Sequence, residues 1–223
     1  LKLVNSGLVD VTAGGLSFNN GFDNFGLIRL APTSALVFNS PATFRTGSAI
    51  SSTNGGTLEY RGSYKLMTFE PGAACSATLS NRVTGYCQFA GPINLPNWEL
   101  PAGSGLYGAF TNEGALHWTG GDLNGAITIG SNGVVNLTGS ADKRLVQCAL
   151  NNAGTINWQN GRLVAFATGS GQTVYLINLP GGLILIQTDT NSPIEAANWT
   201  CNIAAYVWAN QGTILKTNSP GTN

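Results

Sequence analysis

The chain has 223 residues, of which 9% are charged and 43% are hydrophobic, and its formal net charge is zero. Nucleic-acid binding requires a cationic surface that neutralises phosphates, so this composition argues against nucleic acid, and equally against an anionic membrane surface, as a partner. No apolar run approaches the length of a membrane span, and the regular alternation of hydrophobic residues argues against disorder.

An Asn-x-Gly motif recurs from one end of the chain to the other. Its copies read NSGLVDV, NFGLIRL, NGGTLEY, NEGALHW, NAGTINW and NQGTILK, and they begin at Asn5, Asn24, Asn54, Asn112, Asn152 and Asn210. A related glycine near the middle of each long gap completes a set of nine glycine marks: Gly7, Gly26, Gly56, Gly85, Gly114, Gly133, Gly154, Gly182 and Gly212. Neighbouring marks are 19 residues (26 − 7) to 30 residues (56 − 26) apart. Internal repeats of this period indicate a solenoid.

The residues that follow each mark alternate between two chemical classes. The second and fourth positions are apolar in every unit except for Lys216, and the third position is polar until the last two units. This period of two predicts a strand with one buried and one solvent-exposed face. We expect the glycine to permit φ > 0 at a tight bend, and the asparagine two residues earlier to hydrogen-bond nearby backbone.

A unit of this length cannot bury its own apolar face, whereas stacked copies share a continuous core. The predicted fold class is therefore all-β, a parallel β-helix of about eight to nine coils in which the glycine-led strands form one sheet. Parallel crossovers are generally right-handed, so we expect a right-handed helix. We assign residues 1–217 to this single domain and residues 218–223 to a linker-like tail, and we interpret the chain as part of a longer secreted protein.

The four cysteines are Cys75, Cys87, Cys148 and Cys201. None belongs to a CxxC pair, which argues against a zinc knuckle. Low charge and many turns favour an extracellular chain with one or two disulfides, and Cys75–Cys87 is favoured because it closes a short loop. The alternative is four buried thiols, since cysteine is among the most buried residue types.

The segment between Gly56 and Gly114 departs from the regular pattern and is expected to form loops on one flank. Trp98 lies between two prolines in PNWELP, which predicts a stiff exposed loop, and Tyr107 follows the flexible AGSG. Tyr86 lies on the outward parity of its strand. An exposed aromatic ring offers an apolar face to the C–H side of a pyranose. For Trp98 the alternative is a loop folded back over the solenoid.

Other aromatic residues and the outward positions have separate expected roles. Tyr60, Trp118 and Trp158 share the inward parity, which predicts a stacked aromatic core. The outward positions form an expected polar ladder that could hydrogen-bond sugar hydroxyls: Glu59, Gln88, His117 and Asn157. A β-1,4-linked pyranose advances by about one strand spacing, roughly 4.8 Å, so a chain along the helix axis would meet one polar side chain per sugar. For His117 the alternative is a plain solvent-facing residue.

The sequence offers no catalytic set. A glycosidase needs two carboxylates facing each other across the scissile bond, but the 10 acidic residues are scattered and no Asp-Asp pair occurs. His117 is the only histidine, and no Gly-x-Ser-x-Gly motif surrounds a serine. We therefore expect no catalytic residue, no metal and no cofactor; a calcium ion would suit such a fold, but no residue pattern indicates one.

The repeat N-x-G-[TA]-[LI]-x-W, followed by a glycine and a leucine, resembles repeats of large secreted bacterial β-helix proteins, which include adhesins and parts of polysaccharide-degrading enzymes. The neutral, Gly- and Asn-rich composition also resembles the β-helical xylan-binding carbohydrate-binding modules of bacterial glycoside hydrolases. This resemblance implies an extracellular, monomeric, non-catalytic module that binds a plant cell-wall polysaccharide, with xylan favoured. The alternatives are a structural adhesin or passenger segment, and a polysaccharide lyase or hydrolase.

Overall fold

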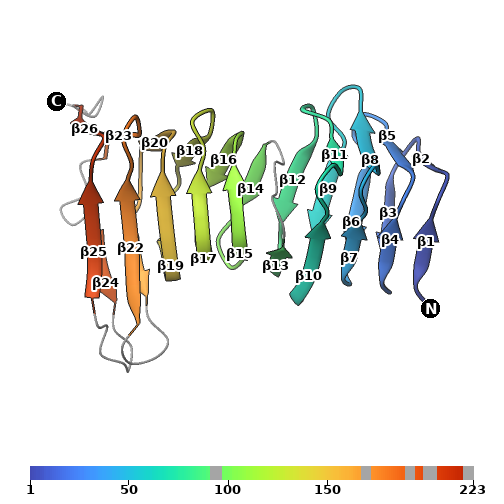
Figure 1. Ribbon diagram of the computed structural model, residues 1–223, viewed down its shortest axis with the longest axis horizontal. Helices are drawn as coiled ribbons and strands as arrows, with labels where there is room; N and C mark the ends of the chain where they lie inside the picture. The colour runs from blue at the N-terminus through green and yellow to red at the C-terminus, as the bar shows by residue number, and fades with distance from the viewer. Residues whose placement is uncertain (91–96, 167–171, 189–193, 198–204, 218–223) are drawn as a thin grey trace.

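The computed structural model describes residues 1–90, 97–166, 172–188, 194–197 and 205–217. These residues form an all-β parallel solenoid of about eight turns, which confirms the predicted fold class. Figure 1 shows the turns following one another along the long axis of the molecule, from the N-terminal end in blue to the C-terminal end in red. In the part of the chain that is described, no helix is long and apolar enough to cross a membrane. The predicted tail, 218–223, lies outside the described residues.

The strands form three sheets, and neighbouring turns pair in parallel. Sheet A contains β1 (Leu3–Asn5), β4 (Phe22–Asn24), β7 (Ala42–Phe44), β10 (Ser63–Phe69), β13 (Tyr86–Ala90), β15 (Gly105–Asn112), β17 (Gly121–Ile129), β19 (Lys143–Asn152), β21 (Leu163–Phe166), β22 (Thr173–Asn178), β24 (Ile194–Ala197) and β25 (Ala205–Asn210). Sheet B contains β2 (Leu8–Val11), β5 (Leu27–Leu30), β8 (Ala49–Ser52) and β11 (Ala74–Cys75). Sheet C contains β3 (Gly15–Phe18), β6 (Ala35–Phe38), β9 (Thr57–Tyr60), β12 (Ser80–Val83), β14 (Trp98–Leu100), β16 (Ala115–Trp118), β18 (Val134–Leu137), β20 (Thr155–Trp158), β23 (Leu183–Ile186) and β26 (Thr213–Lys216).

The walls of the solenoid change part-way along it. The first four turns have one strand in each sheet, and sheet B ends at β11. From β10 onward the strands of sheet A lengthen at their N-terminal side, so that β19 pairs with β21 through Lys143–Val146 and with β22 through Ala149–Asn152. We call this additional part section A1; it consists of β21 and the first residues of β10, β13, β15, β17 and β19. Section A1 therefore supplies the third wall that sheet B supplies in the early turns.

The prediction that all glycine-led strands share one sheet is wrong. Gly7 and Gly26 lead into sheet B, Gly85 leads into sheet A, and the other six marks lead into sheet C. The motif marks a corner rather than a particular strand, and the wall that follows the corner differs between early and later turns. The narrower expectation is confirmed: Leu58, Leu116, Val135 and Ile156, which follow Gly56, Gly114, Gly133 and Gly154, lie in sheet C and are buried.

The reason for glycine at the marks also differs from the expected one. None of the nine marks has φ in the left-handed region. Instead, a Cβ at most of them would collide with backbone of the turn beneath: at Gly154 it would lie 2.3 Å from the carbonyl oxygens of Gly130 and Gly133. The turns therefore stack too closely at these corners for any side chain.

Asparagines that end strands of sheet A form two short hydrogen-bonded ladders, one in the early turns and one in the later turns. The Asn5 Nδ2 donates to Asn24 Oδ1 at 2.7 Å. In the later turns Asn152 Nδ2 donates to Asn178 Oδ1, and Asn178 Nδ2 donates to Asn210 Oδ1, both at 2.7 Å. Motif asparagines also bond the backbone of their own corner, as in the 2.7 Å bond from Asn112 Nδ2 to the Gly114 carbonyl, which confirms the expected local hydrogen bonding. The bonds of the two ladders thus join the corners of neighbouring turns.

The core confirms the inward parity of Tyr60, Trp118 and Trp158, all of which are buried. The indole Nε1 of Trp158 donates to the Gly161 carbonyl at 2.9 Å, and that of Trp118 to the Gly121 carbonyl at 3.3 Å. This satisfies the polar end of each large ring inside an apolar core.

The predicted exposed loop around Trp98 is wrong. Trp98 begins strand β14 of sheet C and is 1% exposed, and its ring lies 5.7 Å from that of Tyr60 and 5.2 Å from that of Phe89. Pro101 directly follows this strand, where no ladder hydrogen bond needs its missing N–H. Pro101 therefore ends a short strand, and the alternation of Trp98 and Leu100 places both side chains inside.

The predicted Cys75–Cys87 disulfide is also wrong. Cys75, Cys87 and Cys148 are free thiols, and Cys201 lies outside the described residues. Burial raises the pKa of the Cys75 and Cys87 thiols to about 12. Because the thiolate is the reactive form, these cysteines act as small apolar core residues, which is the alternative that the sequence left open.

Candidate functional site

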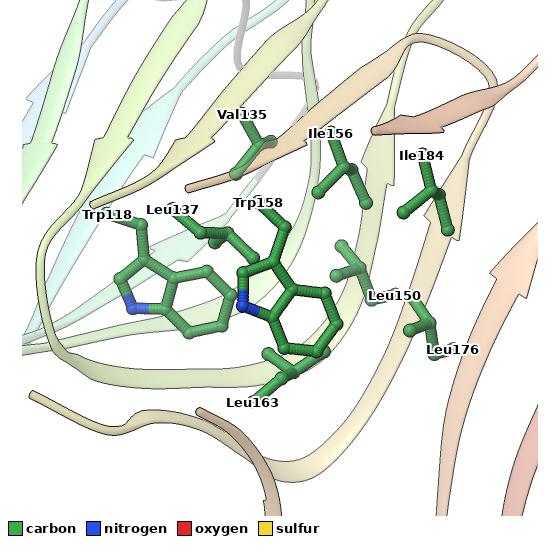
Figure 2. A pocket seen from close by; sticks show the side chains of 9 residues that line it. All are labelled: Trp118, Val135, Leu137, Leu150, Ile156, Trp158, Leu163, Leu176 and Ile184. Atoms are coloured by element: carbon green, nitrogen blue, oxygen red, sulfur yellow. The ribbon is translucent and has the colours of Figure 1, made fainter. Parts of the chain in front are cut away.

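A gap in the core of the described residues is too small to be a ligand pocket. This gap between the later turns has a volume of about 10 Å³ and only apolar walls. Figure 2 shows its nine lining side chains, with the indoles of Trp118 and Trp158 beside aliphatic residues of sheets A and C. An apolar gap of this size is at or below the volume of one water molecule and stays dry. It is a packing defect of the core.

Lys143 is buried but is closed off from any substrate. Its Nζ donates to the carbonyl oxygens of Gly139, Ala141 and Asn160 at 2.6, 2.9 and 3.1 Å. A Cβ at Gly161 would lie 2.5 Å from this ammonium group, so glycine leaves the space that it fills. Burial lowers the pKa of Lys143 to about 8. Through these three carbonyl contacts Lys143 joins two neighbouring turns, so its role is structural.

The seven predicted site residues divide among three places. Trp98 lies in the core. Glu59, His117 and Asn157 lie on sheet C, as predicted for a common ladder, whereas Gln88, Tyr86 and Tyr107 lie on sheet A. The predicted ladder is therefore wrong for Gln88, because Gly85 leads into a different wall. On sheet C the outward positions follow one another in this order: Glu59, Arg82, Glu99, His117, Asn136 and Asn157.

The polar groups of this sheet C ladder largely satisfy one another. Glu59 accepts hydrogen bonds from Arg61 at 2.8 Å and Thr84 at 3.1 Å, and the Arg61 bond lowers the pKa of its carboxyl. Asn157 Nδ2 donates to Asn136 Oδ1 at 2.9 Å. His117 is exposed, as expected. No aromatic residue stands between Glu59 and Asn157 in the ladder, so it lacks a stacking face.

Three tyrosines form a cluster on the outer face of section A1. The rings of Tyr64 and Tyr86 stack with centroids 5.8 Å apart. Tyr107 meets Tyr64 edge-on at 5.6 Å and Tyr86 at 6.0 Å. Tyr64 is 63% exposed, whereas Tyr86 and Tyr107 are half-buried. These separations are typical of favourable aromatic pairs, and together the three rings form a platform at the surface. We call it the tyrosine cluster.

The backbone is shaped to build this cluster. Tyr64 has φ 56°, and the register of β10 against β13 shifts between Ser63 and Lys65, which is a β-bulge. The bulge turns Tyr64 outward. Gly105, which pairs with Tyr86, leaves room for the neighbouring rings: a Cβ there would lie 2.5 Å from the Tyr107 ring and 2.7 Å from the Tyr86 ring. A non-glycine residue held at positive φ costs free energy, and such residues cluster at functional sites.

Polar and charged groups border the tyrosine cluster. Gln88 is exposed and pairs in register with Tyr107. Farther along section A1, Arg144 Nε and Nη2 donate to the two oxygens of Asp122 at 2.6 and 2.9 Å. The Arg144 guanidinium lies over the Phe166 ring, 5.6 Å from its centroid. This bidentate pair holds both side chains in fixed positions beside the tyrosines.

The electrostatics keep this surface close to neutral. Burial raises the pKa of the Tyr107 hydroxyl well above its usual range, and the nearby Asp122 carboxylate adds to this. Burial also raises the pKa of the Asp122 carboxyl, whereas its hydrogen bonds to Arg144 lower it. At neutral pH the Tyr107 hydroxyl is therefore an uncharged donor and acceptor, and the ion pair cancels its own charge.

Tyr64 was missed by the sequence analysis because its bulge breaks the period of two. The sequence contained one signal, because RGSY and TGYC each place a tyrosine shortly after a glycine. In the structure a Cβ at Gly85 would lie 2.4 Å from the Gly62 carbonyl oxygen. The two glycines occupy equivalent corners of successive turns, so tyrosines that follow them meet.

Comparison of the chain with protein-family models, with curated proteins and with solved structures finds no match in any of the three. The likeness to β-helix proteins is confirmed at the level of the fold, and the likeness to xylan-binding modules stays a prediction. Within the described ranges, no group of three or more His, Cys, Asp or Glu side chains could hold a metal ion.

Proposed function

We propose that the protein is a non-catalytic carbohydrate-binding module and that its binding surface is the outer face of section A1. The observation that carries the proposal is the tyrosine cluster: three rings, one of them 63% exposed, gathered by a bulge and a glycine gap. The ligand would be a plant cell-wall polysaccharide, with xylan favoured, and the protein would act outside the cell as part of a larger secreted enzyme.

The chemistry of the surface suits a sugar better than other ligands. A pyranose has an apolar C–H face and a rim of hydroxyls, so it needs a flat ring beside neutral hydrogen-bonding groups. Tyr64 and Tyr86 offer such rings, and Gln88 and the tyrosine hydroxyls offer donors and acceptors. The chain's zero net charge gives no long-range attraction for a nucleic acid or an anionic surface.

Retardation in native gels that contain xylan, glucan, mannan or pectin tests the proposal, with hydrolysis assayed in parallel. We expect retardation by at least one of the neutral polysaccharides and no release of sugars. Tyr64→Ala and Tyr86→Ala should each weaken retardation about fivefold or more, since a stacked ring contributes on the order of 1 kcal/mol beyond its buried area. Their melting temperatures should change little.

Two matched variants complete the design. Tyr175→Ala removes a surface tyrosine, 37% exposed, from β22 of the same sheet and should leave retardation unchanged. His117→Ala tests the sheet C ladder and should also have no effect. Equal retardation of the wild type and of both cluster variants would contradict the proposal, and loss of retardation in His117→Ala would move the site to sheet C.

A further inference from the structure

The tyrosine cluster is one end of a longer stripe that crosses six neighbouring strands of section A1. One outward column follows the pairing register of β10, β13, β15, β17, β19 and β21: Leu66, Gln88, Tyr107, Asn124, Val146 and Phe166. A second column runs beside it through Tyr86, Gly105, Asp122 and Arg144. The stripe thus begins among the three tyrosines and ends at Phe166, which is half-buried. Between them lie Asn124, the paired Asp122 and Arg144, and Val146, which is buried at 5% exposure.

The stripe is laid out along the solenoid axis because it crosses successive turns. Phe166 is three strand steps from Tyr107, which at about 4.8 Å per step is about 14 Å. All six strands span five steps, or about 24 Å. A β-1,4-linked chain advances by about one strand spacing per sugar, so about five sugars would cover the stripe.

The charges on the stripe favour one class of glycan. Asp122 and Arg144 neutralise each other through two hydrogen bonds, and the Phe166 ring covers the guanidinium. The remaining members of both columns are neutral. A uronic acid would therefore find its most obvious partner, Arg144, already bound to a carboxylate, whereas hydroxyls can bond to Gln88 and Asn124 without displacing any charge.

We propose, on the basis of the function proposed above, that the ligand is a neutral, extended glycan of about five sugars that lies along the solenoid axis, with the tyrosine cluster under one end and Phe166 under the other. Phe166 then acts as a distant stacking platform, and the Asp122–Arg144 pair fixes the space between the two platforms. The affinity then depends on the length of the glycan, because a short oligosaccharide can reach only one of the two stacking platforms.

Calorimetric titration with xylo-oligosaccharides, from the disaccharide to the octasaccharide, tests this arrangement. Affinity of the wild type should rise up to about five sugars and then level off. Phe166→Ala should lower affinity for the hexasaccharide about fivefold and leave the trisaccharide unaffected, whereas Tyr86→Ala should lower affinity for both. Phe166→Tyr keeps the ring and should bind as the wild type does.

Charge selectivity is tested with polygalacturonate at low salt. The wild type should not bind it, whereas Asp122→Asn leaves Arg144 without its carboxylate and should gain salt-dependent binding. Tighter binding of polygalacturonate than of xylan by the wild type would overturn the neutral class.

The failures of the two proposals are distinguishable. If the wild type binds no polysaccharide in gels or in titrations, the proposed function fails. If it binds, but its affinity levels off at the disaccharide or Phe166→Ala loses the same factor at every length, the function stands and the axial arrangement over Phe166 is overturned.

Discussion

In the early turns, residues 1–83, the strand after the corners at Gly7 and Gly26 joins sheet B, whereas in the later turns, residues 97–188, the strand after the equivalent corners joins sheet C. The corner itself is the same in both regions: a buried asparagine ends a strand of sheet A and bonds the next turn. The later turns compensate for the missing wall by lengthening sheet A into section A1. One repeated corner therefore supports two cross-sections.

The cores of the two regions differ accordingly. The early turns stack phenyl rings on one another, as in Phe18–Phe22 at 4.2 Å and Phe44–Phe69 at 4.4 Å. In the later turns Trp118 and Trp158 lie among aliphatic side chains (Figure 2). The outer faces differ as well: sheet B presents Asp10 and Arg29, which pair at 3.3 Å, whereas section A1 presents aromatic rings. The comparison teaches that the candidate surface depends on section A1, which begins at β10, in the last turn that has a strand of sheet B, and forms the third wall of the later turns.

The largest expected effect comes from removing a core indole. Trp98→Ala and Trp158→Ala should each lower the free energy of unfolding by roughly 3–5 kcal/mol, because both rings are buried and leave a cavity. Urea unfolding midpoints measure this. An unchanged midpoint for Trp98→Ala would contradict the burial of Trp98 and would support the exposed loop that its flanking prolines suggested.

Glycine marks give a matched pair of variants. In Gly154→Ala the new Cβ would lie 2.3 Å from two carbonyl oxygens of the turn beneath, so the turns must separate, at a cost of about 3 kcal/mol. Gly7→Ala makes the same change in the first turn, where nothing lies within 4 Å, and should change stability by less than about 0.5 kcal/mol. Equal effects of the two variants, measured by thermal unfolding, would show that backbone conformation, not close stacking, selects glycine.

Removing an asparagine from the hydrogen-bonded ladder should lower the free energy of unfolding by less than these substitutions do. Asn178 Nδ2 donates to Asn210 Oδ1 and to the carbonyls of Gly182 and Thr213, and its Oδ1 accepts from Asn152. Asn178→Ala should lower the free energy of unfolding by about 2 kcal/mol, because buried partners lose their bonds.

Asn54→Ala is the control for the ladder, because Asn54 belongs to a motif copy but is exposed. At that corner the Ser52 hydroxyl takes the place of the asparagine and accepts a bond from the Gly56 N–H at 2.8 Å. We expect Asn54→Ala to change stability by less than about 0.5 kcal/mol. A loss as large as that of Asn178→Ala would mean that the motif stabilises through the isolated turn and not through the ladder.

The repeat made the solenoid predictable, because alternation and the Asn-x-Gly spacing reflect local strands and stacked corners directly. It could not show which wall each glycine leads into, since the same alternation of buried and outward positions follows Gly85 and Gly114, but these glycines lead into sheets A and C. Nor could it distinguish a glycine needed for close stacking from one needed for positive φ. The candidate site depended on the bulge at Tyr64, which shifts one residue out of the period of two.

The central claim is that section A1 binds a neutral polysaccharide through its tyrosine cluster. The most direct test is to measure the dissociation constant for xylan of the triple variant Tyr64→Ala/Tyr86→Ala/Tyr107→Ala and to compare it with that of Tyr175→Ala. The account predicts that the triple variant remains folded and loses measurable binding, whereas Tyr175→Ala binds as tightly as the wild type. Wild-type affinity in a folded triple variant would contradict it.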